Sequence, residues 1–211
     1  MKKHLGFTII ELMITIAVIG IGLAIGVPAM NQFVLDNRLV SQINTLNSSL
    51  ALARSEAVKQ NELTVVCVST TGSAEFPSCA NNTAWTEGWI IFTNRDGNLT
   101  ADLGGADGCA EGATNDCLLA IEPPMSGKNT LVGSPVVTGL IGFNGTGVAR
   151  CDANKDGKLD PGGCAIDDTD TPYFTLCDQR GAAHARALAV SNTGRTSSIK
   201  TNPTGGALVC P

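Results

Sequence analysis

The sequence predicts an α+β protein in which one long N-terminal helix packs on an antiparallel β-sheet domain with disulfide-closed loops. Three observations lead to this prediction. A charge-free apolar run from Leu12 to Met30 continues into a segment with helical apolar spacing. Several short strand-like segments follow, separated by turns rich in Gly, Asn and Asp. Eight cysteines behind the apolar run indicate an oxidising compartment, where disulfides persist.

The N-terminal segment has the length and composition of a membrane-spanning helix, because the apolar run can cross a hydrocarbon core of ~30 Å. Lys2 and Lys3 favour a cytoplasmic position for the end that precedes it. The alternative, a cleaved secretory signal, lacks a polar, small-residue cleavage region after the apolar run. Glu11 lies near the start of the run, and an ionisable residue in such a segment usually has a partner and a function.

The helix is predicted to continue over residues 31–62 as an amphipathic segment. Pro28 is expected to kink or loosen it. The apolar stripe that would pack on the sheet recurs at spacings of three and four and consists of Leu35, Leu39, Ile43, Leu46, Leu50, Ala53 and Ala57.

Residues 63–211 are predicted to form a β-rich globular domain. Trp85, Trp89 and Phe92 are expected in its core, because large aromatic side chains dominate burial. The strand candidates are residues 63–68, 89–93, 118–121, 136–143, 173–177 and 185–191.

The stretch Gly6-Phe7-Thr8-Ile9-Ile10-Glu11-Leu12 resembles the processing signal of type IV pilins and type II secretion pseudopilins. The resemblance implies that a prepilin peptidase cleaves after Gly6 and methylates the new N-terminus at Phe7. It also implies that Glu11 pairs with the N-terminal amine of a neighbouring subunit. The blocks that begin at Ala51, Trp85, Tyr173 and Ala185 are similar to the GspH/FimT/FimU group of minor pilins and pseudopilins.

This resemblance implies a type IV pilin-like fold and a division of the chain into four parts. Residues 1–6 would be the leader, 7–30 the transmembrane and filament-core helix, 31–62 the amphipathic helix, and 63–211 a periplasmic domain. The expected location is the bacterial inner membrane, crossed once, and then a pilus or pseudopilus filament. The expected partners are other pilins and minor pilins, the prepilin peptidase and the inner membrane. No enzymatic activity is expected, because no nucleophile–base motif or phosphate-binding loop is present.

The eight cysteines allow about a hundred pairings. Short loops favour the pairs Cys109–Cys117 and Cys151–Cys164. Proximity in the sequence and the C-terminal staple of related minor pilins suggest Cys67–Cys79 and Cys177–Cys210.

The stretch "CDANKDGKLDPGGC" resembles a calcium-binding loop, with hard oxygen ligands at alternating positions and Gly157 where the turn is sharpest. Gly163 stands where the bidentate Glu is expected, so a carboxylate from outside the loop would have to complete the site. The alternative is a solvated acidic loop closed by a disulfide. No cofactor is expected to be required, and structural calcium is the candidate bound ion. The candidate ligands are Asp152, Asn154, Asp156, Lys158 (through its carbonyl) and Asp160.

The net charge of −5 argues against bulk nucleic-acid binding. A local basic cluster near the C-terminus is nevertheless a candidate phosphate-binding surface; it consists of Arg180, Arg186, Arg195 and Lys200. FimT-type relatives bind DNA through a Gly-Arg-x-Arg motif, and here Ser197 replaces the second arginine after Gly194-Arg195. The leading interpretation is a minor pilin in type IV pilus assembly. The alternatives are a DNA-binding minor pilin for natural transformation and a type II secretion pseudopilin.

Overall fold

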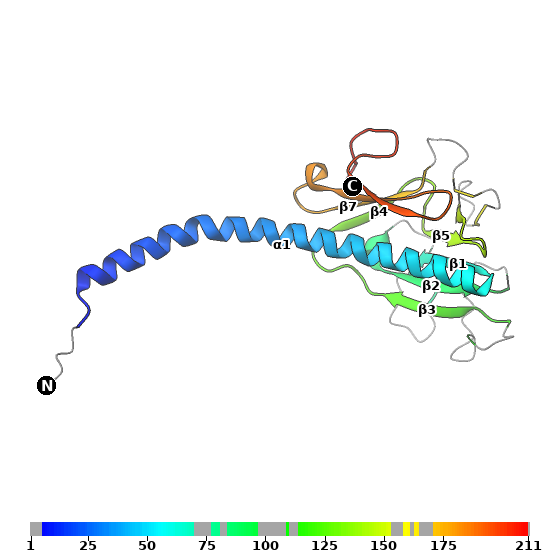
Figure 1. Cartoon of the computed structure of the whole chain (residues 1–211), viewed down its shortest axis with the longest axis horizontal. Coiled ribbons are helices and arrows are strands. Elements are labelled where there is room, and N and C mark those ends of the chain that lie inside the picture. Colours follow the sequence, from blue (N-terminus) through cyan, green and yellow to red (C-terminus); the bar gives the residue numbers. More distant parts are fainter. Residues whose placement is uncertain are drawn as a thin grey trace. The chain divides into compact units, whose positions relative to one another are not determined.

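The chain forms two compact units, Met1–Val40 and Ser41–Pro211, and their boundary lies within helix α1 (Ile9–Gln60). The boundary falls inside the segment 31–62 that the sequence predicts as one amphipathic stretch. Figure 1 shows the chain from N- to C-terminus. The computed structural model describes residues 6–69, 77–80, 84–96, 109, 114–152, 158–160, 163–164 and 171–210.

The first unit contains the N-terminal part of α1, which is helical from Ile9 onward (Figure 1). The helix continues through Pro28, although proline removes one hydrogen bond from the helical ladder. Apolar side chains in this part are largely exposed, among them Ile14, Val18 and Ile21. By length and composition, α1 is the one helix among the described residues that could cross a membrane.

The second unit begins with the C-terminal part of α1, which buries one apolar stripe. The spacing of three and four residues places these side chains on one face, as the sequence predicts. Their exposed fractions are 5% or less for Ile43, Leu46, Leu50, Ala53 and Ala57.

One antiparallel sheet of the second unit has five strands in the order β3-β2-β1-β5-β6. Its strands are β1 (Leu63–Val68), β2 (Trp89–Asn94), β3 (Cys117–Glu122), β5 (Leu140–Phe143) and β6 (Ala149–Cys151). The central strand β1 pairs with β2 on one side and β5 on the other, with Val65 opposite Phe92 and Thr64 opposite Phe143. Apolar β-branched and aromatic residues favour such buried strands.

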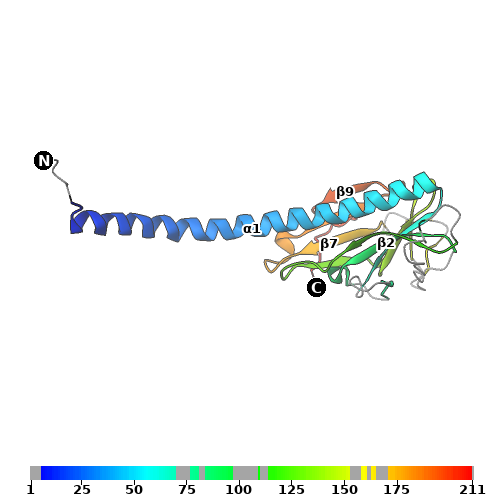
Figure 2. The same ribbon diagram turned by 90° about the horizontal axis from the view of Figure 1, so that it is seen from below.

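The other antiparallel sheet has four strands in the order β4-β7-β8-β9. Its strands are β4 (Thr130–Gly133), β7 (Tyr173–Cys177), β8 (Arg186–Val190) and β9 (Thr196–Ile199), and two 3-10 turns, η1 (Trp85–Glu87) and η3 (Ala182–His184), complete the elements named here. Figure 2 shows β9 alongside α1, where the Thr196 hydroxyl donates a hydrogen bond to the Asn47 side chain.

The predicted strand over residues 136–143 is wrong in its first half, since β5 begins only at Leu140. Ser134 to Val137 form a turn, in which the Val137 N–H donates to the Ser134 carbonyl at 2.8 Å. Three strands were not predicted, namely β4, β6 and β9. All three are end strands of the sheets formed by the described residues, where pairing with another strand is on one side only and the sequence is not required to alternate; on its other side β4 has one isolated bridge, between Val132 and Ala84.

The aromatic residues predicted for the core are buried, with Trp85 and Phe92 at 0% exposure and Trp89 at 1%. Trp85 packs edge-on against Phe174 of β7, with ring centroids 4.9 Å apart. It also lies 6.4 Å from the ring of Trp89 in β2. Trp85 therefore contacts one strand from each sheet and joins the two layers of the core.

Four disulfides use all eight cysteines, in the pairs Cys67–Cys79, Cys109–Cys117, Cys151–Cys164 and Cys177–Cys210. These are the four pairs expected from the sequence. The last one holds the C-terminal segment on the four-stranded sheet, where Leu208 packs with Ala185 and Ala187.

Candidate functional site

The candidate processing site lies just before α1. Gly6 and Phe7 are non-helical, and Phe7 is 78% exposed. A Cβ built on Gly6 would meet no heavy atom within 4 Å. An exposed, non-helical backbone is the conformation in which proteolysis is easiest. The Gly6–Phe7 peptide bond therefore lies in non-helical backbone directly ahead of α1.

Glu11 lies in the first turn of α1, where the partial positive charge of a helix N-terminus favours a carboxylate. Its backbone N–H donates to the Thr8 hydroxyl at 3.3 Å. The Thr8 carbonyl accepts a hydrogen bond from the Leu12 N–H at 3.2 Å. Thr8 was not singled out from the sequence, although Thr-x-x-Glu before an apolar run is a helix-start signal.

The candidate calcium ligands lie partly outside the described residues, because Asn154 and Asp156 are among those not described. Asp152 is buried and accepts a hydrogen bond from the Thr138 hydroxyl at 3.5 Å. Lys158 is exposed, and the Asp160 N–H donates to the Cys151 carbonyl at 2.9 Å.

Within the described part of the chain, no group of three or more His, Cys, Asp or Glu side chains is suited to hold a metal. The calcium site stays a prediction from the sequence.

Three of the four candidate basic residues lie at the two ends of the β8–β9 hairpin. Ala187 pairs with Ile199, so the next residues, Arg186 and Lys200, lie at the same end of the two strands. Arg195 lies in the turn at the opposite end, between β8 and β9. The structure therefore does not bring all four residues into one patch.

Arg180 is held by a carboxylate of its own turn. Its Nη2 and Nε atoms lie 2.6 and 2.9 Å from Asp178 Oδ2. Burial alone would raise the pKa of Asp178, but the hydrogen bonds and charge of Arg180 outweigh it and lower that pKa below its ordinary value of 3.8. Much of the Arg180 charge is thus neutralised within the chain.

Gly194, in the block that resembles the DNA-binding motif, has a packing role. Its φ of +73° is strained for other residues, and a Cβ there would lie 2.2 Å from the Gly147 carbonyl oxygen. Arg54 of α1 donates from Nε to the same carbonyl at 3.1 Å. The β8–β9 turn, the Gly147 turn and α1 therefore meet here, which explains the glycine without a ligand.

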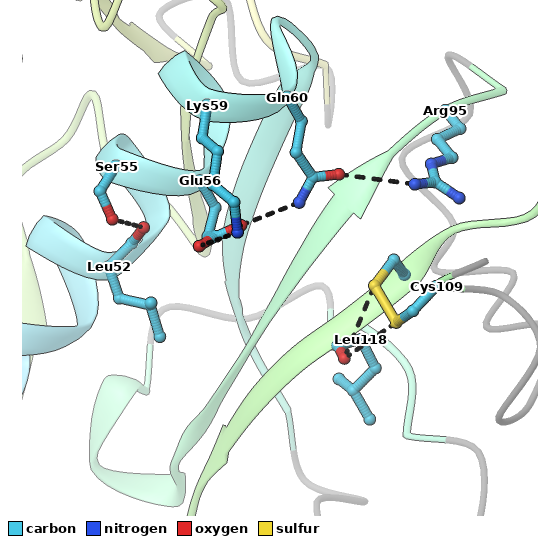
Figure 3. Close-up of polar contacts among 9 residues, drawn as sticks. Leu52, Ser55, Glu56, Lys59, Gln60, Arg95, Cys109 and Leu118 are labelled. Carbon is cyan, nitrogen blue, oxygen red and sulfur yellow. Dashed lines mark hydrogen bonds and ion pairs between the residues drawn. A yellow bond between two sulfur atoms is a disulfide. The ribbon is translucent and has the colours of Figure 1, made fainter. Parts of the chain in front are cut away.

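A polar network fixes the end of α1 near the end of β2 (Figure 3). Glu56 accepts hydrogen bonds from Gln60 at 2.9 Å and Lys59 at 3.2 Å. Arg95 donates to Gln60 at 3.5 Å and to Glu62 at 3.1 Å. The Gln60 hydrogen bond is the main cause that lowers the pKa of Glu56; burial opposes it and Lys59 supports it. Glu56, Lys59 and Gln60 pair within α1, and Arg95 is the residue that links this helix end to the end of β2.

Two family models match the chain, one in its N-terminal segment and one in the residues that follow. The model of the type II transport protein GspH family matches residues 42–194. The model of the prokaryotic N-terminal methylation motif matches residues 1–27. The second match covers Gly6, Phe7 and Glu11.

Among solved structures, the chain is similar to the type IV minor pilin FimU of Pseudomonas aeruginosa in two crystal forms. In the first the identity is 20%, the alignment covers 83% of this chain and 96% of FimU, and the TM-score is 0.49. In the second the identity is 20%, the coverages are 81% and 97%, and the TM-score is 0.46. Since the GspH model spans well over half of the residues and a methylation motif precedes it, the chain belongs to the GspH family of type IV minor pilins and pseudopilins.

Proposed function

We propose that this chain is a minor pilin that takes part in type IV pilus assembly after a prepilin peptidase cleaves behind Gly6. The observation that carries the proposal is a non-helical Gly6–Phe7 bond, within a methylation motif, ahead of a helix of membrane-spanning length. Before assembly the helix crosses the inner membrane once, and the second unit lies in the periplasm. The subunit performs no reaction itself.

The physical role proposed for Glu11 is to set the register of assembly. A carboxylate near the edge of the membrane is unfavourable unless it has a partner. Cleavage behind Gly6 creates a positively charged amine on Phe7, and the amine of a neighbouring subunit would compensate the charge of Glu11. The pair forms only when the two helices are correctly staggered, so it favours one arrangement in the filament.

The test is incorporation of Glu11→Ala into filaments in the native host. The variant is expected to insert in the membrane and to be cleaved, while its share in sheared filaments falls about ten-fold, equivalent to ~1.4 kcal/mol. Thr15→Ala is a matched control, because the Thr15 hydroxyl donates to the Leu12 carbonyl of its own helix. Normal incorporation of Glu11→Ala would contradict the pairing.

A second candidate is a pseudopilin of a type II secretion system, which the description of the matching family favours. Deletion of the gene separates the two. Loss of surface pili with normal protein secretion supports the minor pilin, and loss of secretion with normal pili supports the pseudopilin.

A further inference from the structure

The first turn of α1 gives the backbone N–H of Glu11 a partner within its own chain, the Thr8 hydroxyl. Thr8 meets both criteria for the N-cap residue, which precedes the first helical residue. Its carbonyl accepts the hydrogen bond from Leu12 N–H, and its hydroxyl accepts one from the N–H of Glu11, three residues on. The helix itself begins at Ile9.

We propose that Thr8 and Glu11 form a capping box that positions Glu11 in the unassembled subunit. In a capping box the Thr hydroxyl binds the N–H of the third helical residue, and the carboxylate of that residue binds the N–H of the Thr. Thr8-Ile9-Ile10-Glu11 has this spacing, and the first of the two bonds is present at 3.3 Å.

The box matters more here than in a water-exposed helix. The first N–H groups of any helix lack partners inside the helix, and lipid offers none to replace them. Thr8 satisfies one of these groups at the membrane edge. In the proposed box the Glu11 carboxylate satisfies the Thr8 N–H, and it lies where the helix dipole favours negative charge.

This inference rests on the proposed function in one respect, namely that Glu11 later meets the amine of another subunit. Glu11 then has two successive partners: the Thr8 N–H before assembly and the neighbouring amine afterwards. Thr8 acts as a positioning residue, because it fixes the first turn from which the Glu11 side chain projects.

The box is tested by amide hydrogen exchange on the full-length chain in detergent micelles. Thr8→Val keeps the shape and removes the acceptor, so exchange at the Glu11 N–H should rise about five-fold, the usual effect of losing a cap. Thr8→Ser should stay within about two-fold of the wild type, because serine caps equally well. Thr15→Val controls for the same change inside the helix. Unchanged exchange at Glu11 in Thr8→Val would overturn the proposal.

The two Glu11 variants test the reciprocal bond. Gln serves at this position of a capping box, so Glu11→Gln should keep the Thr8 N–H protected, whereas Glu11→Ala should lose that protection. Equal exchange at Thr8 in both variants would refute the box.

In filaments, Thr8→Val should lower incorporation and Thr8→Ser should restore it. Equal incorporation of both variants would show that Thr8 does not position Glu11. Exchange is measured before assembly, so a failed box leaves the proposed function intact. Normal incorporation of Glu11→Ala would refute the pairing and leave the box intact.

Discussion

The buried ion pair between Asp178 and Arg180 gives the second unit a pH-dependent stability. The folded pKa of Asp178 is lowered, so its contribution is fully present above the ordinary value of 3.8 and is lost as pH falls through the lower folded pKa. Asp178→Asn should reduce the free energy of unfolding at pH 7 by about 1.5–3 kcal/mol, the usual range for a hydrogen bond to a charged group. It should also flatten the decline in stability below pH 4, measured by denaturant unfolding of the disulfide-intact protein.

Glu56→Gln is the comparison for this prediction. Gln at this position keeps an oxygen that can accept the hydrogen bond from Gln60 and loses the charge that faces Lys59. The Lys59 side chain is 73% exposed, and such helix pairs contribute only ~0.3–0.5 kcal/mol. If Asp178→Asn keeps the acid dependence of the wild type, the pair does not govern it.

Individual residues differ in how far the sequence reveals them. Gly6, Phe7 and Glu11 stand out in the sequence because the methylation motif that covers them has particular residue types at fixed spacing, while their roles in cleavage and charge pairing stay predictions. The basic cluster was predicted as one surface because charge was counted along the chain. The register of β8 with β9 separates the basic residues between the two ends of the hairpin. The pairing of Arg180 depends on the turn that also holds Asp178.

At the level of elements, the unpredicted strands are all edge strands, although the edge strand β3 was predicted from its apolar run. Strands β1, β2, β7 and β8 each have two neighbours, so burial enforces the apolar runs by which they were predicted. Strand β9, with the sequence TSSI, has one paired neighbour and exposed serines, and nothing in it distinguishes a strand from a loop. Helix α1 was the easiest element to predict, since the length of its apolar run and the spacing of its buried apolar stripe are both local features of the sequence.

The segment closed by Cys151 and Cys164 carries the calcium prediction. Titration calorimetry with the full chain should show Ca²⁺ binding on the order of 10⁻⁴–10⁻³ M, the range of weak extracellular sites. Asp156→Asn should weaken it, because the loop loses a negative ligand, whereas Glu87→Gln, an exposed change in another element, should not. Absence of binding heat at millimolar Ca²⁺ would remove the site and leave an acidic loop held by its disulfide.

For the whole molecule, charge and topology favour the assembly interpretation over DNA uptake, which stays a prediction to be tested. A net charge of −5 repels polyanions at long range. The basic side chains are divided between two ends of a hairpin, and Arg180 is already paired. A phosphate backbone that lies across one end would thus meet few free cations.

DNA binding measured over a salt series tests this argument. Arg186 and Lys200 together can neutralise two phosphates, which predicts a slope of log K against log salt of about −1.8 and a Kd no tighter than ~10⁻⁴ M at physiological salt. Arg195→Ala, at the other hairpin end, should then leave the slope unchanged. A wild-type slope steeper than this, which becomes shallower in Arg195→Ala, would mean that both ends of the hairpin bind one DNA molecule. The protein would then act in DNA uptake, and Asp178→Asn should strengthen the binding by releasing Arg180.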